Sequence, residues 1–205
     1  MLWRNLPLAG IVAVIVIATL VRPLLQYVRH GSFGIFLFRS GGTGQKLRDS
    51  LFVLMVAAFV AQAIGPMHRP WVHPLVGGVL YDAMQVAGAI LMLGGIALFA
   101  AAQLNLGASW RIGIEEAAAP GLVTHGLYSL SRHPIFLGLL TVAAGYALVL
   151  PTPLSLALLG GAYIGLRLQI ASEEAYLIRT YGEPYRLYAR RVGRLVPGVG
   201  RIGDK

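Results

Sequence analysis

Long stretches without charged residues dominate the pattern of this sequence. A helix that crosses about 30 Å of hydrocarbon needs about 20 mostly apolar residues. Four windows without Asp, Glu, Lys or Arg approach or exceed that length, and each predicts at least one membrane-spanning helix. They lie between Arg4 and Arg22, between Asp49 and Arg69, between Asp82 and Arg111, and between Arg132 and Arg167.

The fourth window is too long for one span and contains Pro151 and Pro153 at its middle. Two prolines remove backbone donors that a continuing helix needs, so a tight helical hairpin is predicted there. The fold class is therefore all-α: a polytopic membrane bundle of about five transmembrane helices, with residues 1–82 as a two-span N-terminal scaffold and 83–205 as a three-span core. The expected spans lie near Leu6–Val21, Leu51–Gly65, Ala83–Leu104, Ile135–Leu150 and Leu154–Ile170.

A cleaved signal peptide is the alternative for the N-terminus, since Arg4 precedes an apolar run. The segment Val21-Arg22-Pro23 lacks the small-residue pattern of a cleavage site, which favours a retained span. The chain contains no cysteine, so disulfides, thiolate metal sites and cysteine nucleophiles are excluded.

Composition agrees with a membrane location: 57% of residues are hydrophobic, 12% are charged, and the mean hydropathy is +0.70. If the C-terminus is cytoplasmic, 15 of the 17 Lys and Arg residues fall on the cytoplasmic side and only Arg4 and Arg69 fall outside. This sorting follows the positive-inside rule and predicts an outside N-terminus. The cytoplasmic set would be Arg22, Arg29, Arg39, Lys46, Arg48, Arg111, Arg132, Arg167, Arg179, Arg186, Arg190, Arg191, Arg194, Arg201 and Lys205.

The net charge of +9 is explained by this topology and by attraction to anionic membrane lipid. No nucleic-acid partner is predicted, because the basic residues are divided among three loops. No metal site is predicted either. His68 and His73 share one loop, yet no third ligand lies near them in the sequence.

A first polar cluster, Ser131-Arg132-His133-Pro134, stands at the start of the fourth expected span. Proline suits a first helical position, and the free backbone donors of a helix N-terminus attract an anion. Arg132 and His133 add hydrogen-bond donors at the same point. The alternative is that Arg132 only marks the membrane border by extending toward the headgroups.

A second polar cluster, Glu173-Glu174, follows the fifth expected span. Gly182 suits a helix end, and Pro184 suits the start of a short amphipathic cytoplasmic helix that continues through Arg191. A tight hairpin would bring both clusters to one membrane face and make a polar pocket. The alternative for the C-terminal segment is an acid–base tail that lies on anionic lipid.

These residues resemble the superfamily of isoprenylcysteine carboxyl methyltransferases and phospholipid methyltransferases. The resemblance covers about residues 107–197 and implies an integral membrane methyltransferase that uses S-adenosylmethionine, in a pocket formed by the last spans and the C-terminal segment. Its residues are Leu122-Val123-Thr124, Gly126 and Tyr128, then Arg132-His133-Pro134 and Gly138, then Glu173-Glu174 and Leu177, and finally Gly182, Tyr185, Tyr188, Arg191-Val192 and Pro197.

The resemblance also implies roles for single residues. Arg132, Arg191 and Glu174 would be catalytic, with the two arginines orienting the acceptor. Many members carry tyrosine where this chain has Phe136, so a hydroxyl role is excluded at that position. The implied cofactor-binding residues are Tyr128, His133, Pro134, Gly138, Glu173, Glu174, Leu177, Tyr185 and Tyr188.

The sequence does not fix the identity of the methyl acceptor. A prenylcysteine carboxylate, a phospholipid amine, or another small lipophilic molecule fits a pocket that opens to lipid. Methyl transfer from a sulfonium needs mainly orientation and electrostatic support, so no catalytic triad is required. Two alternatives remain: an NADPH-dependent membrane reductase of the sterol reductase type, and a non-catalytic membrane adaptor.

Overall fold

The protein is a bundle of long helices, described by a computed structural model over residues 2–35, 43–65, 74–110 and 121–203, with side chains from Asn5 onward. No β-strand occurs in these segments, where Ser131 and Gly193 form an isolated parallel bridge. The helices are α1 (Leu2–Val16), the π-helix η1 (Ile17–Val21), α2 (Arg22–His30), α3 (Thr43–Ile64), α4 (Gly78–Asn105), the short η3 (Gly107–Ser109) and η4 (Gly126–Ser129), α5 (Pro134–Val149), α6 (Pro153–Tyr181) and α7 (Glu183–Arg191).

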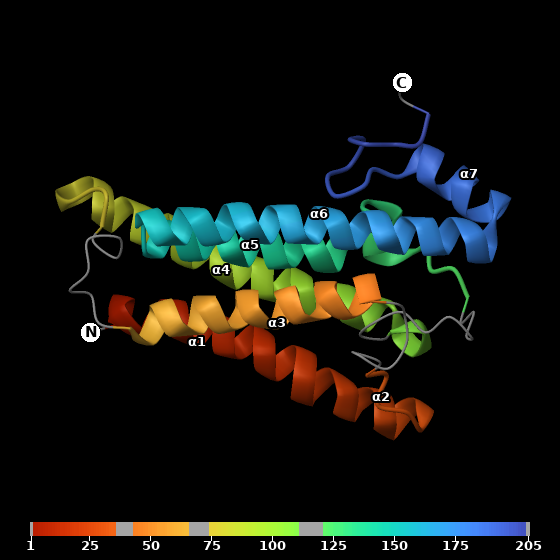
Figure 1. Cartoon of the computed structure of the whole chain (residues 1–205), viewed down its shortest axis with the longest axis horizontal. Helices are drawn as coiled ribbons and strands as arrows, with labels where there is room; N and C mark the ends of the chain where they lie inside the picture. Colours follow the sequence, from red (N-terminus) through yellow and green to blue (C-terminus); the bar gives the residue numbers. More distant parts are fainter. Residues whose placement is uncertain (1, 36–42, 66–73, 111–120, 204–205) are drawn as a thin grey trace.

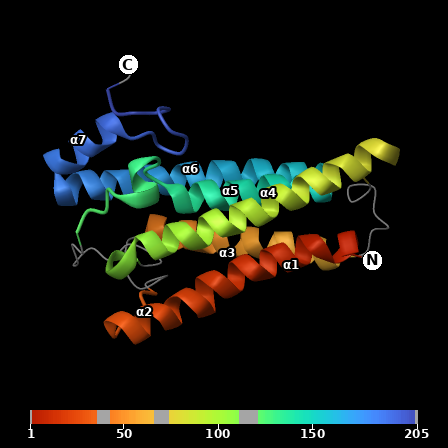
Figure 2. The ribbon, with the colours of Figure 1, turned by 180° about the vertical axis from the view of Figure 1, so that it is seen from behind.

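The long helices run side by side along the longest axis of the molecule (Figures 1 and 2). The N-terminus and the turn between α5 and α6 lie at one end, which we call the hairpin end. Helix α7, the C-terminus and the start of α5 lie at the other, which we call the α7 end. Segments 107–110 and 126–134, far from α7 in the sequence, therefore lie at the same end as α7.

Four helical segments are long and apolar enough to cross a membrane: Asn5–His30, Thr43–Ile64, Gly78–Asn105 and Pro153–Tyr181. The apolar helix α5 has 16 residues, which corresponds to about 24 Å at 1.5 Å per residue. That length falls short of a hydrocarbon core of about 30 Å. Four of the five expected spans thus have full length, and the fourth in chain order is the short one.

The predicted hairpin between α5 and α6 is confirmed. Helix α5 ends at Val149, and α6 begins at Pro153, which occupies a first-turn position where its missing N–H costs nothing. The Thr152 hydroxyl caps α6 by accepting a hydrogen bond from the Ser155 backbone N–H at 3.1 Å. Both side chains are fully buried.

A closed polar network fixes this turn against α3. The Gln62 side-chain Nε2 donates to the Thr152 and Ser155 hydroxyl oxygens at 2.8 Å each. The Tyr146 hydroxyl lies 3.0 Å from the Phe59 carbonyl and 3.3 Å from Gln62 Oε1. Hydrogen bonds satisfied inside an apolar bundle hold three helices in one register.

Helices α4 and α5 make backbone contact through glycines. A Cβ on Gly145 would stand 2.6 Å from the Gly88 carbonyl oxygen, and one on Gly95 would stand 2.7 Å from the Val142 nitrogen. One on Gly138 would stand 2.8 Å from the Phe99 nitrogen. Small residues allow such close approach in membrane bundles, where packing rather than hydrophobic burial drives association. This seam fixes the start of α5 relative to the end of α4.

Two helices extend beyond the expected span limits. The first continues past Val21 to His30, because a π-helical stretch precedes Pro23 and accommodates the proline that would otherwise break the ladder. Helix α6 continues past Ile170 to Tyr181 and ends at Gly182, which has φ +59°. Glu173 and Glu174 therefore lie on the same continuous helix as the fifth expected span.

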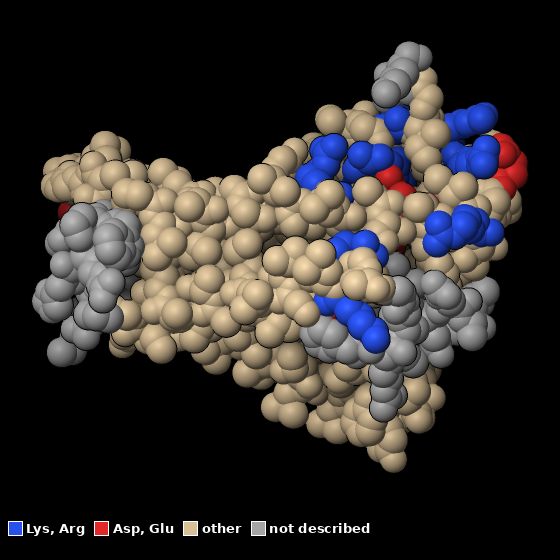
Figure 3. All heavy atoms as spheres, viewed as in Figure 1, with Lys and Arg blue, Asp and Glu red and all other residues tan. Residues whose placement is uncertain are grey.

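Positively charged side chains gather at the α7 end on the face shown in Figure 3. The rest of that face carries almost none among the described residues. This agrees in kind with the sorting of Lys and Arg expected from the sequence. The expectations for Arg39, Arg69, Arg111 and Lys205, and for the histidines His68 and His73, lie outside the described residues, as does the side chain of Arg4.

Candidate active site

Arg132 is the centre of a buried polar cluster at the α7 end. All five N–H groups of its guanidinium are directed at protein oxygens. Nε and Nη2 donate to Glu174 Oε1 at 3.0 and 2.7 Å, and Nη2 also donates to the Gly200 carbonyl at 3.0 Å. Nη1 donates to the Ala189 and Val192 carbonyls at 2.8 and 2.7 Å. Arg132 thus joins α6, α7 and the segment after α7.

Three side chains contact the Glu174 carboxylate. Its Oε1 accepts from Arg132 and lies 3.4 Å from His133 Nε2, and its Oε2 lies 2.7 Å from Arg194 Nη2. The carboxylate is 7% exposed, and buried carboxylates need partners of this kind to stay ionised. The two polar clusters predicted to meet across the hairpin are in direct contact.

The His133 ring lies between the two adjacent acids of α6. Its Nδ1 is 3.7 Å from Glu173 Oε2, and its Nε2 faces Glu174. The Glu173 side chain is 38% exposed, unlike that of Glu174. The ring of Phe136 stacks on His133 with centroids 5.6 Å apart. Glu173 is therefore the acid of the pair that remains accessible to a ligand.

Helix α7 covers the cluster with a tyrosine pair. Tyr185 and Tyr188 are buried, with ring centroids 6.0 Å apart, and Leu177 of α6 packs against them. The Tyr188 hydroxyl donates to the Tyr128 carbonyl at 2.6 Å, which ties α7 to η4. Burial raises the pKa of the Tyr188 hydroxyl to about 12. It therefore stays a neutral donor.

Tyr185 differs from Tyr188 in one respect. Its side chain is 1% exposed, and its hydroxyl has no hydrogen-bond partner among the described residues. Burial raises the pKa of this hydroxyl above its ordinary value, so it also keeps its proton. An unpaired buried hydroxyl is costly, so Tyr185 is a candidate for a hydrogen bond to a ligand.

The short helix η4 is held by the end of α4. The Asn105 Oδ1 accepts from the Leu127 backbone N–H at 2.9 Å, and Gly126 has φ +59° with no room for a Cβ beside Asn105. The structure shows a bond to the η4 turn, and that turn carries Tyr128.

A second buried arginine supports the end of α4. Arg22 of α2 is 4% exposed and donates to the Gln103 and Gly107 carbonyls at 3.2 and 2.6 Å. Its guanidinium lies 4.8 Å from the Trp110 ring centroid. Carbonyls at a helix C-terminus carry partial negative charge and favour a cation. The N-terminal helices therefore position the end of α4, which in turn positions η4.

Some predicted site residues lie elsewhere. Arg191 is exposed, and its Nε reaches only the Leu187 carbonyl of its own helix at 3.4 Å. Gly138 belongs to the α4–α5 seam rather than to the polar cluster. Pro134 is fully buried at the first position of α5, where it sets the direction of the preceding His133. In the described residues, no group of three His, Cys, Asp or Glu side chains is arranged to hold a metal ion.

Arg194 is a cluster member that sequence reasoning missed. It follows Gly193, whose carbonyl accepts from the Arg132 backbone N–H at 2.9 Å, and its own carbonyl accepts from the His133 N–H at 3.2 Å. The bridge between Ser131 and Gly193 thus places Arg194 beside Glu174. No spacing of residues in the sequence indicates the pairing of Arg194 with Glu174, because it depends on the path of the chain after α7.

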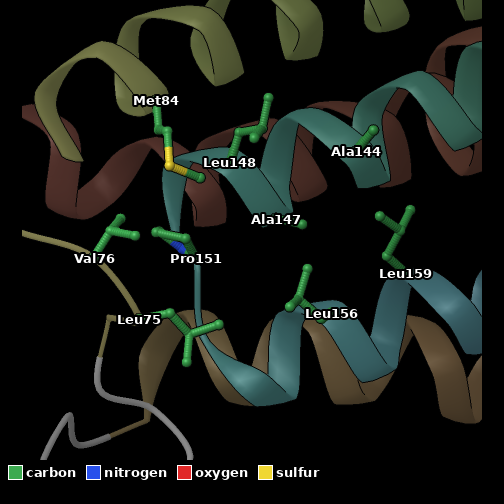
Figure 4. A pocket seen from close by; sticks show the side chains of 9 residues that line it. All are labelled: Leu75, Val76, Met84, Ala144, Ala147, Leu148, Pro151, Leu156 and Leu159. Atoms are coloured by element: carbon green, nitrogen blue, oxygen red, sulfur yellow. The ribbon is translucent and has the colours of Figure 1, made fainter. Parts of the chain in front are cut away.

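The described residues also form a partly open apolar cavity of about 320 Å³ at the hairpin end, lined by residues such as Leu75, Met84, Ala147 and Leu156 (Figure 4). Along α5, Ala147 stands 14 residues from His133, or about 20 Å at 1.5 Å per residue. This cavity contains no polar side chain and is separate from the Arg132 cluster.

Comparison with known proteins gives the cluster its context. The profile of the phospholipid methyltransferase family matches residues 83–184, a segment that includes Arg132, His133, Glu173 and Glu174. The chain belongs to the superfamily of isoprenylcysteine carboxyl methyltransferases and phospholipid methyltransferases. Superfamily membership and the long apolar helices together make it an integral membrane protein.

Similar proteins from the superfamily include the protein-S-isoprenylcysteine O-methyltransferase of Dictyostelium discoideum, 30% identical over 55% of this chain and 48% of that protein. Enzyme A of that name from Arabidopsis thaliana is 34% identical over 55% of this chain and 58% of its own length. Methanethiol S-methyltransferase 1 of Bradyrhizobium diazoefficiens is 37% identical over 40% of this chain and 28% of its own length. The chain thus spans about half or less of each relative.

A solved structure shares the fold of this chain. The eukaryotic intramembrane Ras methyltransferase, isoprenylcysteine carboxyl methyltransferase, superimposes with a TM-score of 0.61 at 18% identity. The superposition covers 96% of this chain and 68% of that one. The bundle, including its N-terminal helices, therefore has the architecture of that enzyme.

Proposed function

We propose that this protein is an integral membrane methyltransferase that uses S-adenosylmethionine and a lipophilic acceptor, with residues 83–205 as its catalytic core. The observation that carries the proposal is the buried contact of Arg132 and His133 with Glu174 inside the segment matched by the family profile. The similar proteins of known name are methyltransferases, which supports this activity over a reductase or an adaptor.

The residues at the cluster fit the chemistry of the cofactor. S-adenosylmethionine carries an amino group and ribose hydroxyls that need acceptors, and a carboxylate that needs donors. Glu173 offers a partly exposed carboxylate, Tyr185 offers an unpaired buried hydroxyl, and Arg194 is one-third exposed. We assign these three residues, with Tyr128, His133, Pro134, Leu177 and Tyr188 as surroundings, to the cofactor site.

S-adenosylmethionine supplies an already activated methyl group on a sulfonium, so the protein's contribution is orientation, exclusion of water and electrostatic support. Because every N–H of the Arg132 guanidinium donates to a protein oxygen, we assign Arg132 the role of holding Glu174 and the covering segment in place. Glu174 in turn orients His133 through its Nε2. His133 is the group beside the site that can take a proton from an amine or thiol acceptor. Arg191 and Gly138 have no direct part in this arrangement.

We infer a lipophilic acceptor because the cluster lies just past the apolar part of α6, where a molecule dissolved in the bilayer has access to it. The acceptors named for similar proteins, isoprenylcysteine and methanethiol, differ in size and reacting atom. Membrane lipid and a prenylcysteine carboxylate are therefore both acceptors to be tested.

We propose five spans, with the short α5 completed by tilt or by local thinning of the bilayer. The N-terminus would then lie outside and the C-terminus, with the site, in the cytoplasm. The gathering of positive charge at the α7 end supports this orientation. Cysteines introduced at single positions of this cysteine-free chain would report it. Labelling of a Glu183→Cys variant by an impermeant reagent in intact cells would contradict it.

Calorimetric titration of the detergent-purified protein with S-adenosylhomocysteine and with NADPH tests the activity class. We expect saturable binding of S-adenosylhomocysteine only, weakened at least tenfold in Glu174→Gln. The matched control is Asp82→Asn, which changes an exposed acid at the hairpin end and should bind as the parent does. Binding of NADPH alone would identify a reductase, and binding of neither ligand would contradict an enzyme of either class.

A further inference from the structure

The segment after α7, residues 193–202, covers the Arg132 cluster, and we call it the strap. Its backbone is fixed at several points: the Gly193 and Arg194 carbonyls accept from Arg132 and His133, and the Ile202 N–H donates to the Ala189 carbonyl at 3.0 Å. In Figure 1 the strap first turns back along α6 toward the middle of the bundle and then returns toward α7. It therefore forms a compact loop beside the end of α6.

The depth of the strap follows from its attachment to α6. Arg194 binds Glu174, which lies four residues, or about 6 Å, past Ile170 at the end of the apolar stretch. The headgroup layer on each side of the hydrocarbon core is about 5–8 Å thick. The anchored base of the strap is therefore at headgroup depth, and Val199 lies at the same level, because the Arg194 N–H donates to the Val199 carbonyl at 2.8 Å.

The tip of the strap has the side chains of an interfacial segment. Val196 and Val199 are 51% and 65% exposed, and a turn in which the Val199 N–H donates to the Val196 carbonyl at 3.1 Å holds them together. The Arg201 guanidinium lies close to Gly198 at the tip, and Arg194 stands at the base with its side chain 33% exposed. Between Pro184 and Gly203 the chain has five arginines and no acid: Arg186, Arg190, Arg191, Arg194 and Arg201.

We propose that the strap is a membrane-binding loop whose Val196 and Val199 insert at the boundary between headgroups and hydrocarbon of an anionic lipid leaflet. Apolar residues at such a boundary, next to arginines that contact lipid phosphates, are the two features by which peripheral segments bind anionic membranes. Because the strap also holds Arg132 and Glu174, membrane contact and the geometry of the cluster are linked. The proposal does not depend on the activity proposed above.

The test is the immersion depth of a nitroxide at Val199, introduced as Val199→Cys into the full chain, which has no other cysteine. The labelled protein is reconstituted into vesicles of phosphatidylcholine with or without phosphatidylserine. Accessibility to oxygen and to a water-soluble nickel chelate gives the depth. Ile164→Cys is the hydrocarbon reference, since Ile164 is 62% exposed on the membrane-spanning part of α6. Glu183→Cys is the aqueous reference, since it follows the end of α6 about 16 Å past Ile170.

We expect a nitroxide at position 199 to lie between the two references in anionic vesicles, with a nickel accessibility at least threefold below that at position 183. It should be shallower in vesicles of phosphatidylcholine alone, and Arg201→Gln should make it shallower in anionic vesicles. Equal readings at positions 199 and 183 in both vesicle types would overturn the insertion. An intermediate depth that changes with neither lipid charge nor Arg201 would overturn the preference for anionic lipid.

Discussion

Helices α5 and α6 carry a buried polar cluster at each end, and the two clusters differ in what they leave unsatisfied. At the hairpin end, Gln62, Thr152, Ser155 and Tyr146 bond one another or backbone groups, and they carry no charge. At the α7 end, Arg132 and the two acids of α6 bring charge into the bundle, and the Tyr185 hydroxyl has no partner among the described residues.

The difference separates a structural network from a candidate site on physical grounds. A network whose donors and acceptors are all used gives rigidity and has nothing to offer a ligand. A cluster with an accessible carboxylate and an unpaired buried hydroxyl carries a cost that ligand binding can remove. Three substitutions would break or sharpen this comparison.

Arg132→Met has the largest expected effect. The Ala189, Val192 and Gly200 carbonyls lose their donor, and Glu174 keeps a buried charge with fewer partners. Breaking a buried ion pair in this way costs about 3–5 kcal/mol. Thermal unfolding in detergent and proteolysis of the strap should both show the loss. Arg179→Met, at an exposed position near the end of α6, is the control; equal stability of the two variants would show that Arg132 does not hold the covering segment.

Gln62→Leu should have an intermediate effect confined to stability. The hydroxyls of Thr152 and Ser155 keep each other as partners at 2.9 Å but lose the amide donor. A loss of about 1–3 kcal/mol is expected for such a buried hydrogen-bond group. The affinity for S-adenosylhomocysteine, measured on the same preparation, should match that of the parent. A weakened affinity with unchanged thermal stability would reverse the roles assigned to the two ends.

Tyr185→Phe has the smallest expected effect and the most specific one. Removing a buried hydroxyl that has no partner among the described residues should not lower stability, because the cost of burying it is removed. Affinity for S-adenosylhomocysteine should fall by about 2–10-fold, which corresponds to one hydrogen bond of about 0.5–1.5 kcal/mol. Tyr188→Phe is the matched control, because its hydroxyl bonds the Tyr128 carbonyl and its loss should lower stability by about 1 kcal/mol. Similar stability losses in both variants would indicate that the Tyr185 hydroxyl has a structural role.

The comparison also shows how far sequence reasoning reaches. Charge-free windows predicted the long helices, and Pro151 with Pro153 predicted the hairpin, because bilayer thickness and proline chemistry act locally. The contact between Arg132 and Glu174 followed from the hairpin. The end of α6 at Gly182 was also predicted, because glycine suits a helix terminus, and the helix continues to Tyr181 past the expected membrane span.

The residues that sequence reasoning misplaced or missed are those whose contacts depend on the path of the folded chain. Arg194 reaches Glu174 only because the strap doubles back, and Arg191 faces outward because α7 buries Tyr185 and Tyr188 instead. Gly138 stands within the matched motif, yet its position on α5 faces the backbone of Phe99. Periodicity places a residue on a helix face, but only the packed neighbours show what that face contacts.

The glycine seam between α4 and α5 limits how a lipophilic acceptor can approach. Where the Gly88 and Gly145 backbones meet, no hydrocarbon chain fits between the two helices, and the same holds one turn after another toward Gly138 and Phe99. Lipid therefore cannot enter between α4 and α5 along the stretch from Gly88 to Phe99. If the acceptor has a hydrocarbon tail, as proposed, that tail would lie elsewhere than in the seam between α4 and α5.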